Sequence, residues 1–137
     1  EFIEGREFTC AVLGEEALPI VEILPNRDAF YTFDAKYEPG GSTHIIPAHI
    51  DEDLAARLQM LALSAHRLLG LRDCSRTDFI VSSDQRPQIL EINSLPGMTA
   101  TSLFPEACAS VGITYEALVD RLLTYALARG ELRDAVA

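Results

Sequence analysis

The sequence is poor in positive charge, in cysteine and in long apolar runs, and each scarcity excludes a class of protein. Lys and Arg number 11 against 21 Asp and Glu, and the net charge of −10 argues against nucleic acid or an anionic membrane surface as the main partner. No apolar stretch approaches the roughly 18 residues of a membrane span, and no basic-then-apolar leader is present, so we expect neither a membrane anchor nor secretion. Cys10, Cys74 and Cys108 are too few and too widely spaced for a disulfide framework or a zinc site, which predicts a reducing, cytoplasmic location.

The rest of the composition is that of a folded domain. Of 137 residues, 48% are apolar and 23% charged, enough to form a core without disulfide or metal staples. Strands are predicted over 7–13, 18–24, 77–82 and 87–93, and helices over 51–70, from Pro105 to Gly112 and after Thr114. This order of elements predicts an α+β fold in which an antiparallel sheet is flanked by helices.

The periodicity of the two longer helices predicts which sides are buried. Asp51 is the expected N-cap of the first helix, and His66 is expected on its exposed flank. The apolar stripe of the first helix consists of Leu54, Leu58, Leu61, Ala65, Leu68 and Leu69. Thr114 is the expected N-cap of the last helix. This helix is expected to bury Leu118, Val119, Leu122, Ala126 and Leu127.

The most informative stretch is the predicted hairpin at 76–93. If the turn is centred between Asp84 and Gln85, Asp78 lies opposite Glu91, and Asn93 lies on the same face two residues on. Opposed carboxylates repel, and a divalent cation would offset that cost. The oxygen donors of all three side chains suit Mg²⁺, Mn²⁺ or Ca²⁺ rather than zinc. The alternative is a solvated face of the hairpin on which both carboxylates simply meet water.

The loop that follows the hairpin predicts a close backbone approach to a ligand. Pro96 and Gly97 force a turn, and a glycine lets backbone N–H groups come near a bound group. Ser102 and Leu103 then lie near a helix start, which is a ready site for an anion. A plain turn would have a similar local sequence.

Five blocks in order, among them EFIEGREFT, FYTFDAKY, SRTDFIV and LEINSLPGMTATSLFP, together resemble the C-terminal part of a D-alanine–D-alanine ligase of the ATP-grasp superfamily. The resemblance runs from Glu1 to about residue 128. It implies that ATP phosphorylates the carboxylate of one D-alanine and that the amine of a second attacks the acylphosphate. The product, D-alanyl-D-alanine, feeds peptidoglycan synthesis.

The resemblance implies roles for the hairpin residues. Asp78, Glu91 and Asn93 match the ligands of two Mg²⁺ (or Mn²⁺) ions that contact the phosphates of ATP. Arg76 matches the arginine that stabilises the tetrahedral oxyanion, and the backbone N–H of Gly97 is expected to share that task.

The resemblance also implies the substrate contacts of two loops. Ser102 and Leu103 match positions that hold the carboxylate of the second D-alanine. Lys36, the only lysine, matches a residue that contacts the transferred phosphoryl group. Tyr37 lies in a loop, about 28–48, that matches the active-site lid, where a tyrosine goes with dipeptide rather than ester synthesis.

At the N-terminal end, the backbone of Glu1 and Ile3 matches the adenine contacts, and Glu7 matches the carboxylate that binds the ribose hydroxyls. Residues 1–130 are thus expected to be the C-terminal half of an ATP-grasp catalytic region, with 131–137 a frayed tail. We expect the chain to lack the N-terminal part of the enzyme, to be inactive alone and to form a homodimer. The alternatives are an ATP-grasp ligase with another acceptor, such as D-lactate, or a non-catalytic module that binds a cation or dimerises.

Overall fold

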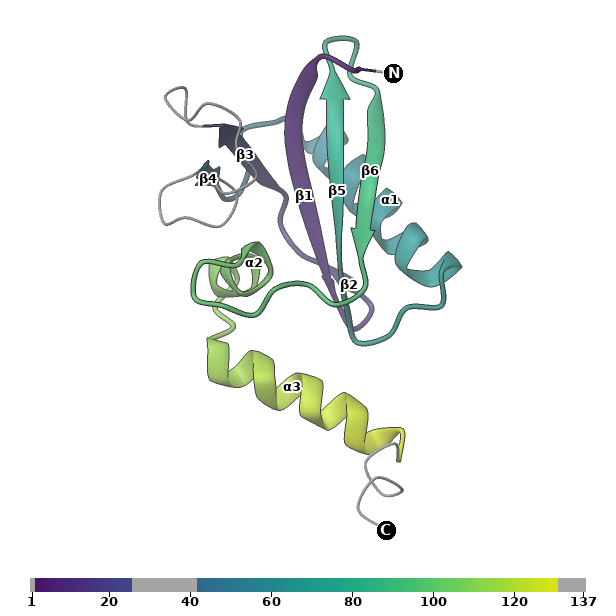
Figure 1. The fold of residues 1–137 in the computed structure, drawn as a ribbon, viewed down its shortest axis with the longest axis vertical. Coiled ribbons are helices and arrows are strands. Elements are labelled where there is room, and N and C mark those ends of the chain that lie inside the picture. The colour runs from purple at the N-terminus through teal and green to yellow at the C-terminus, as the bar shows by residue number, and fades with distance from the viewer. Residues whose placement is uncertain (1, 26–41, 131–137) are drawn as a thin grey trace.

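In a computed structural model of the protein, residues 2–25 and 42–130 are described. They form an α+β fold, as the sequence predicts (Figure 1). The strands are β1 (Gly5–Leu13), β2 (Glu16–Ala17), β3 (Val21–Pro25), β4 (Ser42–Ile45), β5 (Cys74–Ser82) and β6 (Pro87–Asn93). The helices are α1 (Glu52–Leu68), α2 (Leu103–Ser110) and α3 (Tyr115–Ala128).

The strands form one six-stranded sheet in the order β4-β3-β1-β5-β6, with β2 paired to β1. All pairings are antiparallel, as predicted. β1 lies at the centre and pairs with β5 over its whole length, from Gly5 opposite Ser82 to Leu13 opposite Cys74. The two strands are far apart in the sequence, so this long-range pairing sets the position of everything that β5 and β6 carry.

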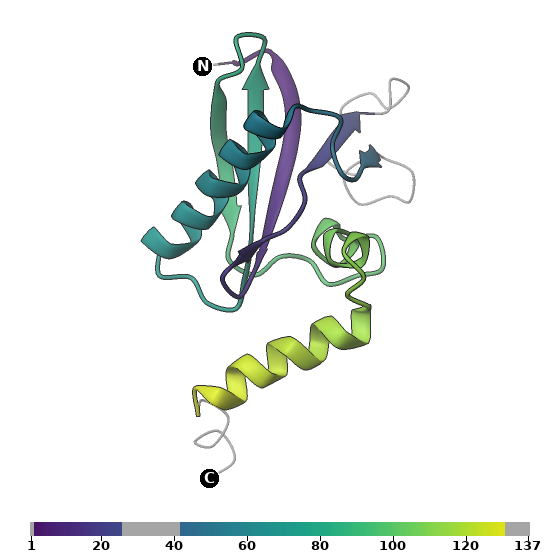
Figure 2. The same cartoon turned by 180° about the vertical axis from the view of Figure 1, so that it is seen from behind.

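The sheet has a different cover on each face. Helix α1 crosses the face of β1, β5 and β6 (Figure 2), where Phe8, Phe79 and Leu58 are fully buried. Helix α2 packs on the other face, near one end of β1, through Phe104, which is also fully buried. Because successive side chains of a strand point to opposite faces, the even-numbered residues of β5 share the face on which α2 packs.

Helix α1 confirms the predicted cap and corrects the predicted stripe. The Asp51 carboxylate accepts a hydrogen bond from the Leu54 N–H at 2.7 Å. The residues that are buried are Leu54, Leu58, Ala62, Ala65 and His66. Leu68 and Leu69 are wrongly placed by the periodicity, since they are 86% and 60% exposed. The last turn of α1 projects past the edge strand β6 in both views, where no sheet remains to cover it (Figures 1 and 2).

His66 is the second correction, because the prediction of a surface position is wrong. Its side chain is 2% exposed, and its Nδ1 lies 2.8 Å from the hydroxyl oxygen of Ser75 on β5. The spacing of Leu58, Ala62 and His66 at four-residue intervals places all three on one helix face. Burial lowers the pKa of His66 below its ordinary value of 6.5.

This buried imidazole predicts a pH-dependent loss of stability. Below about pH 6.5 the unfolded chain binds a proton at His66 that the folded chain does not, so the unfolded state is stabilised relative to the folded state. Stability is therefore complete above this pH and falls by at most about 1.4 kcal/mol per pH unit below it. We expect His66→Gln to flatten the pH dependence of the urea midpoint between neutral pH and the acid limb. His49→Gln, at an exposed position, is the control, and equal slopes in the two variants would contradict the assignment.

Helix α3 begins as predicted, with the Thr114 hydroxyl accepting from the Ala117 N–H at 3.2 Å. The predicted buried side is only partly correct. Of the described side chains of α3, Leu118 alone is fully buried, and Leu127 is 62% exposed. The helix lies beyond one end of the sheet (Figure 1), where Tyr125 packs against the second core cluster and Arg129 forms an ion pair with Asp73, just before β5. Leu127 is not covered by these contacts.

The cysteines behave as small apolar groups. Cys10 and Cys108 are buried, and burial raises the pKa of their thiols to about 12 and about 11. Cys74 is half-buried. Among the described residues, no helix has the length and the apolar character that crossing a membrane requires.

Candidate functional site

The predicted hairpin register is confirmed at the candidate site. Asp78 on β5 pairs with Glu91 on β6, and Arg76 pairs with Asn93. A β-bulge falls between Asp78 and Phe79 and shifts the pairing by one residue toward the turn. The opposed carboxylates and the amide thus lie together on the face that α1 does not cover.

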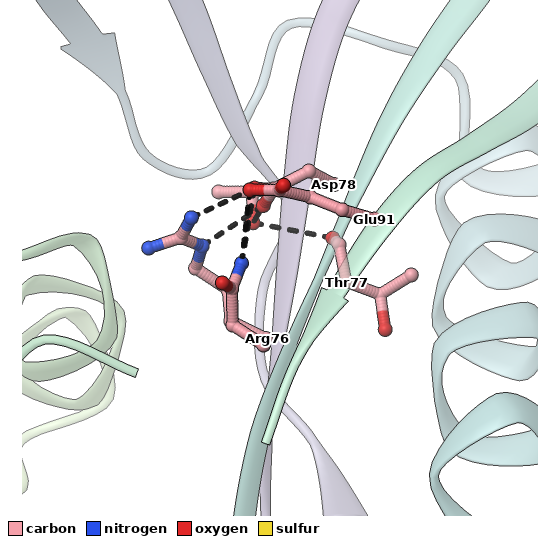
Figure 3. A network of polar contacts seen from close by, with 6 residues as sticks. Arg76, Thr77, Asp78 and Glu91 are labelled. Atoms are coloured by element: carbon pink, nitrogen blue, oxygen red, sulfur yellow. Dashed lines mark hydrogen bonds and ion pairs between the residues drawn. The ribbon is translucent and has the colours of Figure 1, made fainter. Parts of the chain in front are cut away.

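An ion pair that the sequence analysis did not foresee dominates this face. The Arg76 guanidinium donates two hydrogen bonds to Asp78, from Nε to Oδ1 at 2.8 Å and from a terminal nitrogen to Oδ2 at 2.7 Å (Figure 3). The two side chains are only 18% and 9% exposed. Because the contact is bidentate and mostly buried, it fixes the plane and direction of the guanidinium.

Thr9 on β1 completes the support of Asp78, and sequence reasoning missed it. Its hydroxyl donates to Asp78 Oδ1 at 2.5 Å and lies 3.2 Å from the Thr77 carbonyl oxygen. The signal was available only through the pairing of β1 with β5, in which Thr9 lies opposite Asp78. Three strands therefore meet at this carboxylate.

The Asn93 amide lies between the two carboxylates. Its nitrogen is 3.3 Å from Asp78 Oδ2 and 3.3 Å from Glu91 Oε1. These are the longest contacts at the site, and Glu91 is exposed. Rotation of the amide would present its oxygen instead of its nitrogen, giving three converging oxygen donors of the kind that Mg²⁺ and Mn²⁺ prefer. The donor set therefore fits such an ion, although the described residues hold no cluster of three His, Cys, Asp or Glu.

The loop after β6 brings Gly97 against the start of α2. A Cβ at Gly97 would lie 2.8 Å from the Ser102 hydroxyl oxygen, so a side chain there collides. That hydroxyl accepts from the Thr99 N–H at 3.0 Å and lies 2.8 Å from the Thr99 hydroxyl. Ser102 is the N-cap of α2 but makes no side-chain cap bond, whereas Asp51 and Thr114 cap α1 and α3. The N-terminal N–H groups of α2 are thus not satisfied by the cap side chain.

Gly97→Ala is expected to destabilise the loop by about 1 kcal/mol, because Ser102 must rotate and break its bonds to Thr99. Urea unfolding measures the effect. Adding Ser102→Ala to Gly97→Ala removes the colliding oxygen, so we expect the double variant to be no less stable than Ser102→Ala alone. An equal loss in both backgrounds would show that the collision is not the cause.

The other predicted site residues are only partly described. Glu7 lies on β1 two residues before Thr9, on the same face as Asp78, and is half-buried. Ile3 lies just before the start of β1, the strand that carries Glu7. Glu1, Lys36 and Tyr37 lie outside the described residues.

Comparison with known proteins places this site in a family. A family model, the D-ala D-ala ligase C-terminus, matches residues 1–124. The chain belongs to this family. A curated relative, the D-alanine–D-alanine ligase of Synechococcus sp. (strain JA-3-3Ab), is 45% identical over 131 residues, which span 96% of this chain and 41% of that protein. The chain, a C-terminal part of the D-alanine–D-alanine ligase family, thus spans less than half the length of such relatives.

Solved structures of ligases share its fold. The D-alanine–D-alanine ligase from Bacillus anthracis, complexed with ATP, aligns with a TM-score of 0.78 and 29% identity over 96% of this chain and 43% of that one. The VanG D-Ala:D-Ser ligase from Enterococcus faecalis aligns with a TM-score of 0.75 and 30% identity over 91% of this chain and 37% of that one. The predicted ATP-grasp C-terminal fold is confirmed.

Proposed function

We propose that the enzyme to which this chain contributes joins two D-alanines to D-alanyl-D-alanine at the expense of ATP, for peptidoglycan synthesis. The observation that carries the proposal is the meeting of Arg76, Asp78, Glu91 and Asn93 on one hairpin face of a chain of this family. The curated relatives that match this chain at 41–47% identity carry the name D-alanine–D-alanine ligase. The chain on its own is expected to be inactive.

The reaction runs in two steps. A carboxylate oxygen of the first D-alanine attacks the γ-phosphorus of ATP, the bond from phosphorus to the β,γ-bridging oxygen breaks, and ADP leaves. The neutral amine of the second D-alanine attacks the acyl carbon of the resulting acylphosphate, and the nitrogen gives up one proton to a base or to solvent as the tetrahedral oxyanion forms. Collapse of the oxyanion forms the peptide and releases phosphate, which keeps the oxygen it took from the carboxylate.

Asp78, Glu91 and Asn93 would hold Mg²⁺ or Mn²⁺ against the phosphates. A bound ion would neutralise the charge on the phosphate oxygens during transfer. The chain's own contribution is to fix the donors. Thr9 and Arg76 hold the Asp78 carboxylate in place, and the long contacts of Asn93 leave its amide able to rotate.

Arg76 is proposed to stabilise the tetrahedral oxyanion together with the backbone N–H of Gly97. Asp78 accepts from the Nε–H and from one terminal nitrogen of the guanidinium, so the plane and direction of the positive group are fixed. A charge that is oriented before the reaction needs no reorganisation when the oxyanion forms.

Ser102 and Leu103 are proposed to hold the carboxylate of the second D-alanine. The support is the N-terminus of α2, where the dipole favours an anion and the cap side chain leaves the N–H groups available. The remaining roles follow the family resemblance: Lys36 on the transferred phosphoryl group, Tyr37 in the lid, Glu1 and Ile3 on adenine, and Glu7 on ribose.

The test uses the full-length enzyme, with ADP release measured in the presence of ATP and Mg²⁺ and the product identified by mass. We expect ADP release to require D-alanine and to yield the dipeptide. D-Serine and D-lactate are the competing acceptors, and D-serine has specific support in the likeness to VanG. A preference for either would assign another acceptor, and ATP turnover that D-alanine leaves unchanged would contradict ligase activity on this substrate.

A further inference from the structure

A polar contact joins β4 at the edge of the sheet to the first turn of α2. The Nδ1 of His44 lies 2.6 Å from Oε2 of Glu106. Their side chains are 18% and 39% exposed. His44 is held in register by its pairing with Ile23 on β3, and the two partners are 62 residues apart in the sequence.

Glu106 is one turn from the residues proposed to bind the acceptor. Its backbone N–H donates to the Ser102 carbonyl oxygen at 3.2 Å, so the first turn of α2 carries both the proposed carboxylate site and a carboxylate of its own. Both are attracted by the same positive end of the helix dipole. An acidic side chain left free there would repel an anionic substrate.

The packing of α2 does not depend on this contact. Phe104, Ala107 and Cys108 are buried against the sheet and hold the helix by apolar contact. A polar pair that is partly exposed adds little to stability. Stability therefore does not account for the contact between His44 and Glu106. Its effect on the charge near the N-terminus of α2 is the alternative.

We propose that His44 is a positioning residue for acceptor binding. It donates from Nδ1 to the Glu106 carboxylate and so holds this group toward β4. The N-terminus of α2 is thereby left to the carboxylate of the acceptor. This inference rests on the proposed function, since it assumes that Ser102 and Leu103 bind the acceptor.

The test measures KM for the acceptor D-alanine at saturating ATP in the full-length enzyme. His44→Ala lets the Glu106 carboxylate turn toward the N-terminus of α2, and we expect the acceptor KM to rise by up to about tenfold, the order of effect of a unit charge brought close to the substrate carboxylate. KM for ATP should not change. Glu106→Gln removes the charge and should leave the acceptor KM at or below the wild-type value.

The double variant separates charge from structure. His44→Ala with Glu106→Gln has neither the imidazole nor the charge, so the acceptor KM should return to within about twofold of wild type. His44→Gln retains a donor and should fall between wild type and His44→Ala. Arg67→Ala breaks an ion pair with Glu15 elsewhere on the surface and is the matched control, with no expected change in either KM.

Two results would overturn the inference. One is a KM in the double variant as high as in His44→Ala, which would mean that the contact is structural. The other is an unchanged acceptor KM in His44→Ala. In both cases the wild-type enzyme still makes dipeptide, so the proposed function survives. A wild-type enzyme whose ATP turnover does not respond to D-alanine would instead refute both.

Discussion

Replacing Glu91 by glutamine in the full-length enzyme is expected to lower kcat by two to three orders of magnitude, about 3–4 kcal/mol of transition-state stabilisation. The same change should leave the free energy of unfolding within about 0.5 kcal/mol of wild type. The reason is that Glu91 is exposed and its contact with the Asn93 amide is long, at 3.3 Å. Its carboxylate charge therefore contributes little to the stability of the fold, whereas it would contribute strongly to the binding of a cation.

The control for this prediction is Glu16→Gln, which removes an exposed carboxylate from the short strand β2. Steady-state ADP release and urea unfolding are measured on both variants. We expect the control to match wild type in both assays. A Glu91→Gln enzyme with wild-type kcat at low and high Mg²⁺ would remove Glu91 from the metal site and favour the solvated hairpin face.

Replacing Arg76 by methionine is expected to damage both stability and activity. The Asp78 carboxylate would lose two hydrogen bonds and its counter-charge while 9% exposed, at a cost of about 3 kcal/mol. The rate should fall about a thousandfold if the guanidinium also stabilises the oxyanion. Thr9 and Asn93 still donate to Asp78, which keeps the stability cost below that of a bare buried charge.

A second change separates the two effects of losing Arg76. Adding Asp78→Asn to Arg76→Met removes the unpaired charge, so stability should recover to within about 1 kcal/mol of wild type while activity stays lost. Mg²⁺ should also raise the unfolding temperature of Arg76→Met, because the ion replaces the missing positive charge at Asp78. Because Asp78→Asn also removes a proposed metal ligand, the catalytic role of Arg76 is tested in the single variant. Wild-type activity of Arg76→Met at a Mg²⁺ concentration that restores its stability would show that Arg76 acts only by supporting Asp78.

The sheet register at the site could be predicted from the sequence because it depends on local features. The polar turn at 83–86 fixes the centre of the hairpin, and antiparallel pairing then places Asp78 opposite Glu91 without any knowledge of the rest of the fold. Helix caps are equally local, which is why Asp51 and Thr114 were correctly predicted.

The features that could not be predicted depend on contacts between distant segments. Thr9 reaches Asp78 only because β1 pairs with β5, and His44 reaches Glu106 only because α2 packs on the face beside β4. The exposure of Leu68 and Leu127 depends on where the sheet ends rather than on helical spacing. His66 is different, because its four-residue spacing from Ala62 already indicates burial. It was placed at the surface because histidine is polar, and that prediction is wrong.

The central claim is that ATP activates the carboxylate of D-alanine as an acylphosphate. The most direct measurement supplies the full-length enzyme with D-alanine labelled with ¹⁸O in its carboxylate and analyses the inorganic phosphate by mass. The account predicts that each phosphate formed with dipeptide carries a single ¹⁸O, because the attacking carboxylate oxygen leaves with phosphorus. Phosphate without ¹⁸O, formed at the same rate as dipeptide, would contradict it.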